Sequence, residues 1–133
     1  NLEYFFSYFL NKKKKIKSFL IDQKFVSGIG NIYASEILFL CKINPKRSAM
    51  KLSKKDCKNI IVHSKRILNK AIKKGGSSIR DFKNISGKKG NFQEDFNVYQ
   101  RENLDCAKIK CSGKIKKIFI SNRSTFFCNI CQK

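Results

Sequence analysis

The spacing of apolar residues predicts two helices near the start of the chain. The aromatic segment Leu2–Leu10 is the first, and a short helical or extended piece follows the lysine block at residues 11–17, which we expect to be solvated. From Ile29 the apolar positions recur at intervals of three and four, so we expect the second helix to end near Cys41. Its apolar positions are Ile32, Tyr33, Ile37 and Leu40.

A longer helix is predicted after the loop at residues 43–50, through which Pro45 excludes a continuous helix. Ser53 followed by Asp56 has the spacing of a capping box, and the glycines at 75–76 end the helix. Its predicted buried face consists of Cys57, Ile60, Ile61, Ser64, Ile67, Leu68, Ala71 and Ile72.

Four reactive or titratable residues lie in these helices. Cys41 and Cys57 fall on apolar faces, so we expect them to be small core residues. His63 falls off the apolar face and is expected at the surface rather than in a metal site. Glu36 lies on or beside an apolar stripe, which favours a structural carboxylate bonded to nearby backbone donors over a catalytic acid.

The pattern loosens after the long helix and then changes character. Ser78 and Asp81 have the spacing of a cap for one turn of helix, and the stretch that follows, with two glycines, is a candidate mobile loop. Beyond Asn97 the segments KIKKIFIS and STFFC have the β-branched and aromatic composition of strands. We therefore expect a mainly α protein, with a helical domain over residues 1–96 and a small β-hairpin domain over residues 97–133.

The predicted hairpin places a basic residue at its tip. Asn122 and Arg123 would form the turn, and Arg123 would lie exposed beside Lys116 and Lys117. A guanidinium group there can hold a phosphate with its planar fork of donors, although a solvated turn residue would have the same spacing.

Charge adds a partner to this picture. Thirty Lys and Arg against nine Asp and Glu give a formal net charge of +21, which favours a polyanion such as nucleic acid. Lysine far outnumbers arginine, and an AT-rich coding sequence would produce the same bias. No apolar run approaches the ~20 residues that cross a bilayer, and the apolar segment Tyr4–Leu10 lacks the features of a signal peptide.

Four of the six cysteines form the pattern C-x4-C-x16-C-x2-C, made by Cys106, Cys111, Cys128 and Cys131. Two close pairs separated by a hairpin bring four thiolates to one tetrahedral ion, as in a zinc ribbon. Two disulfides or unrelated thiols are the alternatives. Since a module of about 35 residues buries little apolar area, a metal would supply its folding energy.

The predicted helix after Ile29 begins with an unusual mouth, in which Gly28 and Gly30 precede Asn31. A helix N-terminus carries unpaired N–H groups that bind phosphate, and glycines let a backbone come close. Asn31 adds an amide donor. The glycines could equally form only a tight turn.

Four segments together resemble the C-terminal half of the formamidopyrimidine-DNA glycosylase family, bacterial base-excision repair enzymes related to endonuclease VIII. They are FLIDQKFVSGIGNIYASEILF, KKGGSSIRDF, GNFQEDFNVYQRE and NRSTFFCNICQK, and they cover nearly all of the chain. GGSSIRDF and VYQRE look more like the formamidopyrimidine branch.

The resemblance implies a helix-two-turns-helix module over roughly residues 16–41, a helical body and a zinc finger with one structural Zn²⁺. It implies that Asn31 and Arg123 hold the phosphates beside a flipped-out nucleotide, and that Arg123 takes part in δ-elimination. With the glycines of the helix mouth, the expected DNA-binding residues are Lys13, Gly28, Gly30, Asn31, Tyr99 and Arg123. The expected lesion-recognition residues are Ser78, Arg80 and Asp81.

The chain departs from the family pattern in two ways. Its first cysteine knuckle has two residues more than the usual C-x2-C, which puts the local zinc geometry in question. Family members also begin with a β-sandwich domain whose N-terminal proline is the nucleophile and whose next residue, a glutamate, is the acid, and neither is present here. We therefore expect this part to bind DNA but to lack glycosylase activity alone.

The resulting hypothesis is the DNA-binding C-terminal part of a bifunctional DNA glycosylase and AP lyase that removes 8-oxoguanine and formamidopyrimidines. We expect it to act as a monomer on damaged double-stranded DNA, in the bacterial cytoplasm at the nucleoid and away from membranes. The alternative is a non-enzymatic zinc-ribbon nucleic-acid-binding protein, such as a ribosome-associated one. A peripheral protein of anionic membranes ranks last, because no convincing basic amphipathic helix is present.

Overall fold

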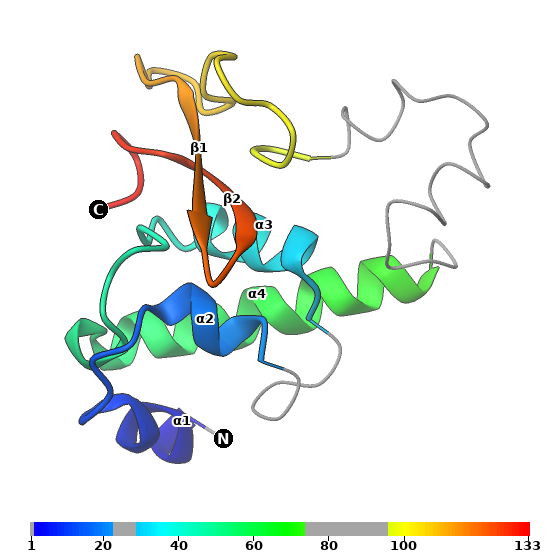
Figure 1. The fold of residues 1–133 in the computed structure, drawn as a ribbon. Coiled ribbons are helices and arrows are strands. Elements are labelled where there is room, and N and C mark those ends of the chain that lie inside the picture. The colour runs from blue at the N-terminus through cyan, green and yellow to red at the C-terminus, as the bar shows by residue number, and fades with distance from the viewer. Residues whose placement is uncertain (1, 23–28, 74–95) are drawn as a thin grey trace.

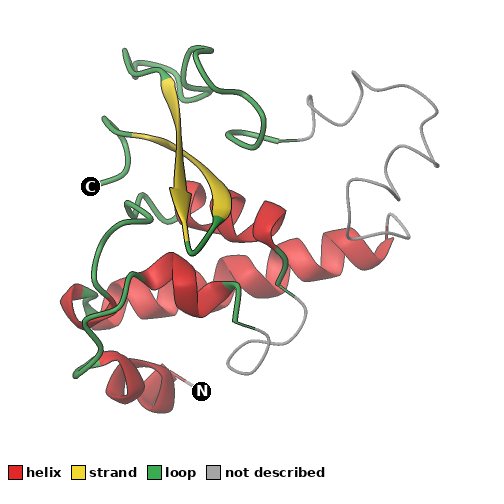
Figure 2. Cartoon of the chain, viewed as in Figure 1, coloured by secondary structure: helices red, strands yellow, loops and turns green. Residues whose placement is uncertain are grey.

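The computed structural model describes residues 2–22, 29–73 and 96–133 (Figure 1). These residues form four α-helices, a 3₁₀ turn and one antiparallel two-stranded sheet, so the described part is mainly α, as predicted (Figure 2). The elements are α1 (Leu2–Phe9), α2 (Ile16–Leu20), α3 (Asn31–Leu40), η1 (Ala49–Lys51), α4 (Lys54–Lys73), β1 (Ile115–Ile120) and β2 (Arg123–Cys128).

Aromatic side chains attach α1 to the rest of the helical body. Phe5 and Phe9, one turn apart on α1, meet edge to face with ring centroids 4.7 Å apart. Phe9 then packs on Phe19 of α2 at 5.2 Å. Helix α1 also contacts α4, which passes behind α2 and below α3 in Figure 1. The aromatic segment at the start of the chain is therefore a helix that packs with one face, on which only Phe9 is fully buried.

The start of α4 confirms the predicted capping box. The backbone N–H of Asp56 donates to Ser53 Oγ, and the backbone N–H of Ser53 donates to Asp56 Oδ2, both at 3.0 Å. Arg47 adds a 3.0 Å ion pair to the same carboxylate oxygen. Cys57 and Ile60 on the predicted face are buried, and Cys41 is buried as well.

Helix α3 lies at the centre of the molecule and belongs to two apolar clusters. Tyr33, Ala34, Ile37 and Leu38 pack with α1, α2 and α4. Phe39 instead packs with Val98 and with buried residues of the hairpin, among them Phe126. Because every side chain from Tyr33 to Phe39 is buried, α3 is surrounded on all sides rather than on a single stripe.

The hairpin differs from the prediction at its turn. Ser121 and Asn122 have φ values of 52° and 61°, which is the left-handed conformation that a two-residue hairpin turn requires at both positions. Arg123 is therefore the first residue of β2 and pairs with Ile120, not a turn residue. Lys116 and Lys117 pair with Phe127 and Phe126 at the other end of the ladder, so the predicted proximity to Arg123 is wrong.

One further expectation fails for reasons of packing. Lys17, the last residue of the lysine block expected to be solvated, is completely buried because α2 is enclosed on all sides. His63 is half-buried, its Nδ1 has no hydrogen-bond partner among the described residues, and it belongs to no metal-binding group there. Of the helices in the described ranges, none combines the length and apolar composition needed to cross a membrane.

Candidate nucleic-acid interface and metal centre

Asn31 is the first residue of α3, and its side chain ties that helix to the hairpin. Its Nδ2 donates to the carbonyl oxygen of Ser124 in β2 at 2.9 Å. One turn later, Ser35 Oγ accepts a 3.4 Å hydrogen bond from the backbone N–H of Phe126. Residues i and i+4 of a helix thus meet residues j and j+2 of a strand, so α3 runs along β2 with Asn31 at the end nearest the turn.

Lys17 is a residue of this site that sequence reasoning missed. Its Nζ donates to Asn31 Oδ1, to Thr125 Oγ1 at 2.8 Å and to the Ser124 carbonyl at 3.4 Å. An ammonium group can only donate, so Asn31 must turn its Oδ1 toward Lys17 and its two amide N–H groups away from it. One of those N–H groups binds Ser124, and among the described residues no acceptor is recorded for the other.

The position of Lys17 changes its acid–base behaviour. Burial, and then the positive charge of Arg123, lower its pKa from the ordinary value to about 8. The charge of Arg123 therefore acts on Lys17. Arg123 also directly precedes Ser124, the residue whose carbonyl Asn31 binds. Asn31 and Arg123, the two residues expected to hold phosphate, thus both lie at the turn end of the hairpin.

Tyr99 lies at the seam between the two apolar clusters. Its ring meets Phe126 edge to face at 5.1 Å and Phe96 at 5.6 Å. Burial raises the pKa of its phenol, against the opposing effect of the Arg123 charge. The hydroxyl is therefore neutral at physiological pH and lies in the field of the same arginine as Lys17.

Glu36 of α3 holds the segment that carries Tyr99, as predicted for a structural carboxylate. Its Oε1 accepts from the backbone N–H of Asn97 at 2.8 Å, and its Oε2 accepts from those of Val98 and Tyr99, each at 2.9 Å. Burial raises the pKa of Glu36, and the three N–H groups oppose that rise. The carboxylate therefore fixes the entry of the chain into the cysteine module.

Of the remaining predicted contact residues, Gly30 and Lys13 lie within the described part of the chain. Gly30 precedes α3 with an extended backbone, and no atom lies within 4 Å of the position that a Cβ would take there. Neither its conformation nor its packing demands glycine, and the space over the helix mouth is open. Lys13 is exposed between α1 and α2, and among the described residues no interaction joins it to Asn31 or Arg123. Gly28, Ser78, Arg80 and Asp81 lie outside the described residues.

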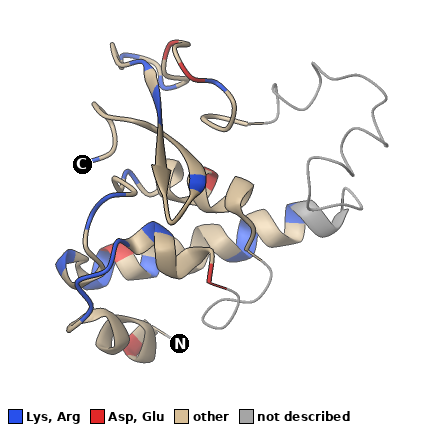
Figure 3. Cartoon of the chain, viewed as in Figure 1, with Lys and Arg blue, Asp and Glu red and all other residues tan. Residues whose placement is uncertain are grey.

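Basic residues extend beyond this cluster. Figure 3 shows Lys and Arg along the segment that enters α2, on α4 and on the hairpin. Ser18 Oγ and Ser121 Oγ lie 2.8 Å apart, so the hairpin turn is bonded directly to α2. Together with the bond between Asn31 and Ser124, this contact joins the hairpin tip and the N-terminus of α3 in one surface.

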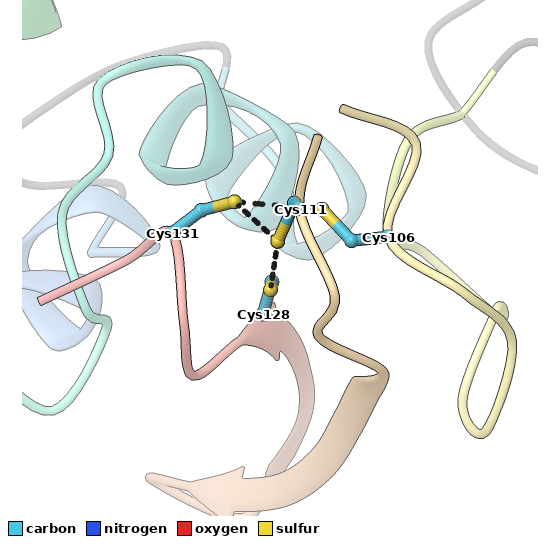
Figure 4. Close-up of side chains that lie close together, drawn as sticks. All are labelled: Cys106, Cys111, Cys128 and Cys131. Atoms are coloured by element: carbon cyan, nitrogen blue, oxygen red, sulfur yellow. Dashed lines mark hydrogen bonds between the residues drawn. The ribbon is translucent and has the colours of Figure 1, made fainter. Parts of the chain in front are cut away.

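The four predicted metal ligands converge at the other end of the hairpin (Figure 4). Their Sγ atoms all lie within 4.8 Å of one another. Cys106 and Cys131 Sγ are 3.5 Å apart, Cys111 and Cys128 Sγ 3.6 Å, and Cys111 and Cys131 Sγ 3.0 Å. A tetrahedral site with a metal–sulfur distance of 2.3 Å has edges of about 3.8 Å, so this donor set fits one such ion with little movement.

Two local features characterise the cysteine cluster. The hydrogen bond with Cys131, and then the backbone N–H of Gly113, lower the pKa of Cys111 to about 7, whereas burial raises the pKa of the Cys106 and Cys131 thiols. Gly113 is a second residue that sequence reasoning missed. A Cβ there would lie 2.6 Å from Cys128 Sγ, so only glycine leaves room for the sulfurs to meet. Its position two residues after a knuckle cysteine is the signal that could have identified it.

Known proteins resemble this chain in sequence. The family "Formamidopyrimidine-DNA glycosylase H2TH domain" matches residues 1–83. A formamidopyrimidine-DNA glycosylase of Roseobacter denitrificans is 46% identical over 125 residues, which are 94% of this chain and 44% of the relative. The chain thus spans about half the length of the curated relatives it matches.

Solved structures give the same picture. A formamidopyrimidine-DNA glycosylase of Lactococcus lactis bound to DNA with an abasic site is 34% identical, with a TM-score of 0.83. A complex of the Lactococcus lactis protein with DNA containing FAPY-dG is 35% identical, with a TM-score of 0.84. Each match covers 100% of this chain and 47% of the other.

Proposed function

The chain belongs to the formamidopyrimidine-DNA glycosylase family, and from this premise we propose that it is the DNA-binding C-terminal part of a bifunctional DNA glycosylase and AP lyase. Its substrates are 8-oxoguanine and formamidopyrimidines in double-stranded DNA, and it acts as a monomer. The observation that carries this proposal is the convergence of Asn31, Lys17 and Arg123 on residues 124 and 125 of β2.

In this proposal the cluster grips the sugar-phosphate backbone beside the damaged nucleotide. The free N–H of Asn31 and the guanidinium group of Arg123 each donate to a phosphate oxygen. Lys17 is a positioning residue, because it orients the Asn31 amide and adds a positive charge beneath it. The open space over Gly30 lets the backbone of the DNA approach the N-terminus of α3.

Other residues complete the proposed contacts with DNA. Tyr99, held by Phe126 and by the Glu36 carboxylate, contacts the DNA backbone. Lys13 and Gly28 complete the contact surface, and Ser78, Arg80 and Asp81 read the lesion. The helix-two-turns-helix module spans roughly residues 16–41, and the division near Asn97 separates the helical part from the zinc finger.

The zinc finger holds one structural Zn²⁺ through Cys106, Cys111, Cys128 and Cys131, whose sulfur geometry supports a tetrahedral ion. The bound ion supplies folding energy and no catalytic chemistry. Cys128→Ser is expected to lower zinc to well below one per chain by elemental analysis and to weaken DNA binding. Stoichiometric zinc in that variant would show that the ligand set is wrong.

The catalytic nucleophile comes from the half of the family's length that this chain does not cover. The single proline of the sequence, Pro45, is internal and buried, so its nitrogen is a tertiary amide and not a nucleophilic amine. Arg123 takes part in the δ-elimination step that follows. We therefore expect the 133 residues alone to bind abasic-site DNA without excising 8-oxoguanine in multiple turnovers.

Binding to a duplex with an abasic-site analogue tests the proposal. If the cluster and its basic surroundings neutralise about six phosphates, the affinity falls roughly a thousandfold between 50 and 200 mM salt. Abasic duplex is expected to outcompete undamaged duplex and RNA of equal length. Preference for RNA would support the alternative of a non-enzymatic zinc-ribbon nucleic-acid-binding protein.

A further inference from the structure

The lengthened cysteine knuckle builds a surface that DNA binding does not use. Four residues separate Cys106 from Cys111, and among them Ile109 and Lys110 are exposed while Lys108 is half-buried. Lys110 takes a left-handed backbone with φ of 74°, which turns the chain sharply after Ile109. Ile109 is 91% exposed, an unusual state for an isoleucine next to a packed metal site.

This knuckle forms one wall of a cleft with a volume of about 500 Å³. Its apolar lining includes Ile109 and Ile130, the latter 50% exposed. Its charged lining residues are Lys42, Lys108, Lys110 and Lys133, and no acidic side chain lines it. The cleft therefore combines an apolar centre with a rim of lysine side chains.

The walls of the cleft are fixed by buried contacts. Gln132 is fully buried, accepts from the backbone N–H of Cys128 at 2.8 Å and donates to the Ile43 carbonyl at 2.9 Å. The backbone N–H of Lys133 donates to the Lys42 carbonyl at 3.4 Å. On the opposite wall, Lys108 Nζ lies 5.5 Å from the centre of the Phe39 ring. A preformed cleft of this kind loses little conformational entropy when a ligand binds.

The cleft lies away from the proposed DNA contacts. Arg123 begins β2 and Cys128 ends it, so five strand steps of about 3.3 Å separate the DNA-binding end from the cysteine end by roughly 17 Å. Figure 1 shows the hairpin turn next to α2, at the opposite end of the hairpin from the cysteines, which pack against Phe39 near the C-terminus of α3.

We propose that this cleft binds an acidic peptide segment that carries one or two aliphatic side chains. The aliphatic groups cover Ile109 and Ile130, and carboxylates on either side pair with the four lysines. A phosphate backbone alone would satisfy the rim and leave both isoleucines exposed, so charge together with apolar area selects a peptide over nucleic acid. The inference does not depend on the DNA-binding proposal, because it uses none of the same residues.

Fluorescence anisotropy on the zinc-loaded chain tests this. The probe is a fluorescein-labelled peptide of aspartate and glutamate with two leucines, and its control has both leucines replaced by serine at the same charge. We expect the leucine peptide to bind more tightly, and Ile109→Ser to weaken it roughly tenfold to a hundredfold, the effect of removing one buried aliphatic side chain. Lys42→Glu, which lies outside the cysteine knuckles, should weaken it as well.

Matched controls keep the outcome decisive. Leu104→Ser and Lys55→Glu change an exposed apolar and an exposed basic residue outside the cleft, and should leave peptide affinity unchanged. Abasic-site duplex affinity should be the same in Ile109→Ser as in the parent chain. Equal binding of both peptides, or unchanged affinity in Ile109→Ser and Lys42→Glu, would overturn the proposal. Weakened duplex binding in Ile109→Ser, with duplex displacing the peptide, would make the cleft a nucleic-acid contact instead.

Discussion

Lys17 predicts that pH acts in opposite directions on folding and on DNA binding. In the free protein its pKa is lowered to about 8 by burial and by Arg123. The unfolded chain has a lysine pKa of about 10.4, so the unfolded state binds more protons between these two values. The free energy of unfolding should therefore rise with pH over the window from about 8 to 10.4.

DNA should reverse this effect. A phosphate held by Asn31 and Arg123 places negative charge near Lys17, which raises its pKa toward the ordinary value. Binding then takes up a proton, and affinity falls as pH rises. If the bound pKa returns fully to about 10.4, the linkage relation gives a loss of about tenfold between pH 7 and pH 9, and uptake of about half a proton at pH 8.

The assay compares the parent chain with Lys17→Met, which keeps an unbranched side chain of similar length but cannot titrate. Duplex affinity is measured by anisotropy from pH 7 to pH 9 at constant ionic strength, and proton uptake by calorimetry in buffers of different ionisation enthalpy. Lys17→Met should bind more weakly at pH 7, because the Asn31 amide loses its orienting donor, and its affinity should be flat with pH. Parallel pH profiles for the two proteins, or no proton uptake by the parent, would refute the reasoning.

Three other perturbations test separate parts of the structure. Arg123→Ala should lower duplex affinity roughly tenfold to a hundredfold with zinc retained, whereas Lys116→Ala, at the far end of the ladder, should have a smaller effect. Gly113→Ala should reduce zinc content, because its Cβ would lie 2.6 Å from a ligand sulfur; Gly30→Ala should keep zinc and weaken only DNA binding. Glu36→Gln should lower the free energy of unfolding, measured in urea, by about 1–3 kcal/mol, since three backbone N–H groups lose a charged acceptor. An unchanged urea midpoint would show that those contacts do not stabilise the fold.

Local signals in the sequence were sufficient for much of the fold. The capping box at Ser53 and Asp56 is formed by residues three apart, so its prediction needs no tertiary information. The cysteine cluster is likewise encoded in spacing, because a close pair before the first strand and a close pair at the end of the second strand meet at the open end of the hairpin when it forms. Glu36 was identified as structural from its place beside an apolar stripe, although its partners 61–63 residues away could not be named.

The errors share a physical origin in contacts between distant segments. The sequence does not distinguish Lys17 from the exposed lysines at 13–15 of the same block. Its burial depends on β2, which lies more than a hundred residues later in the chain. The turn was placed one residue late, since the φ values of Ser121 and Asn122 reflect strand register, which the composition of the segment does not determine. In both cases the missing information is how the hairpin packs on α2 and α3.

That packing also explains why a strongly basic chain keeps a buried lysine close to an arginine. Two like charges in one place oppose folding, and the cost is offset by the hydrogen bonds of Lys17 to Asn31 and Thr125. The same bonds hold the hairpin against the helix mouth, so the residues that stabilise the docked hairpin also concentrate positive potential at the proposed phosphate site. A bound phosphate relieves the repulsion without moving either element, and DNA binding should therefore stabilise the hairpin against α3 more than it stabilises α1 or α4.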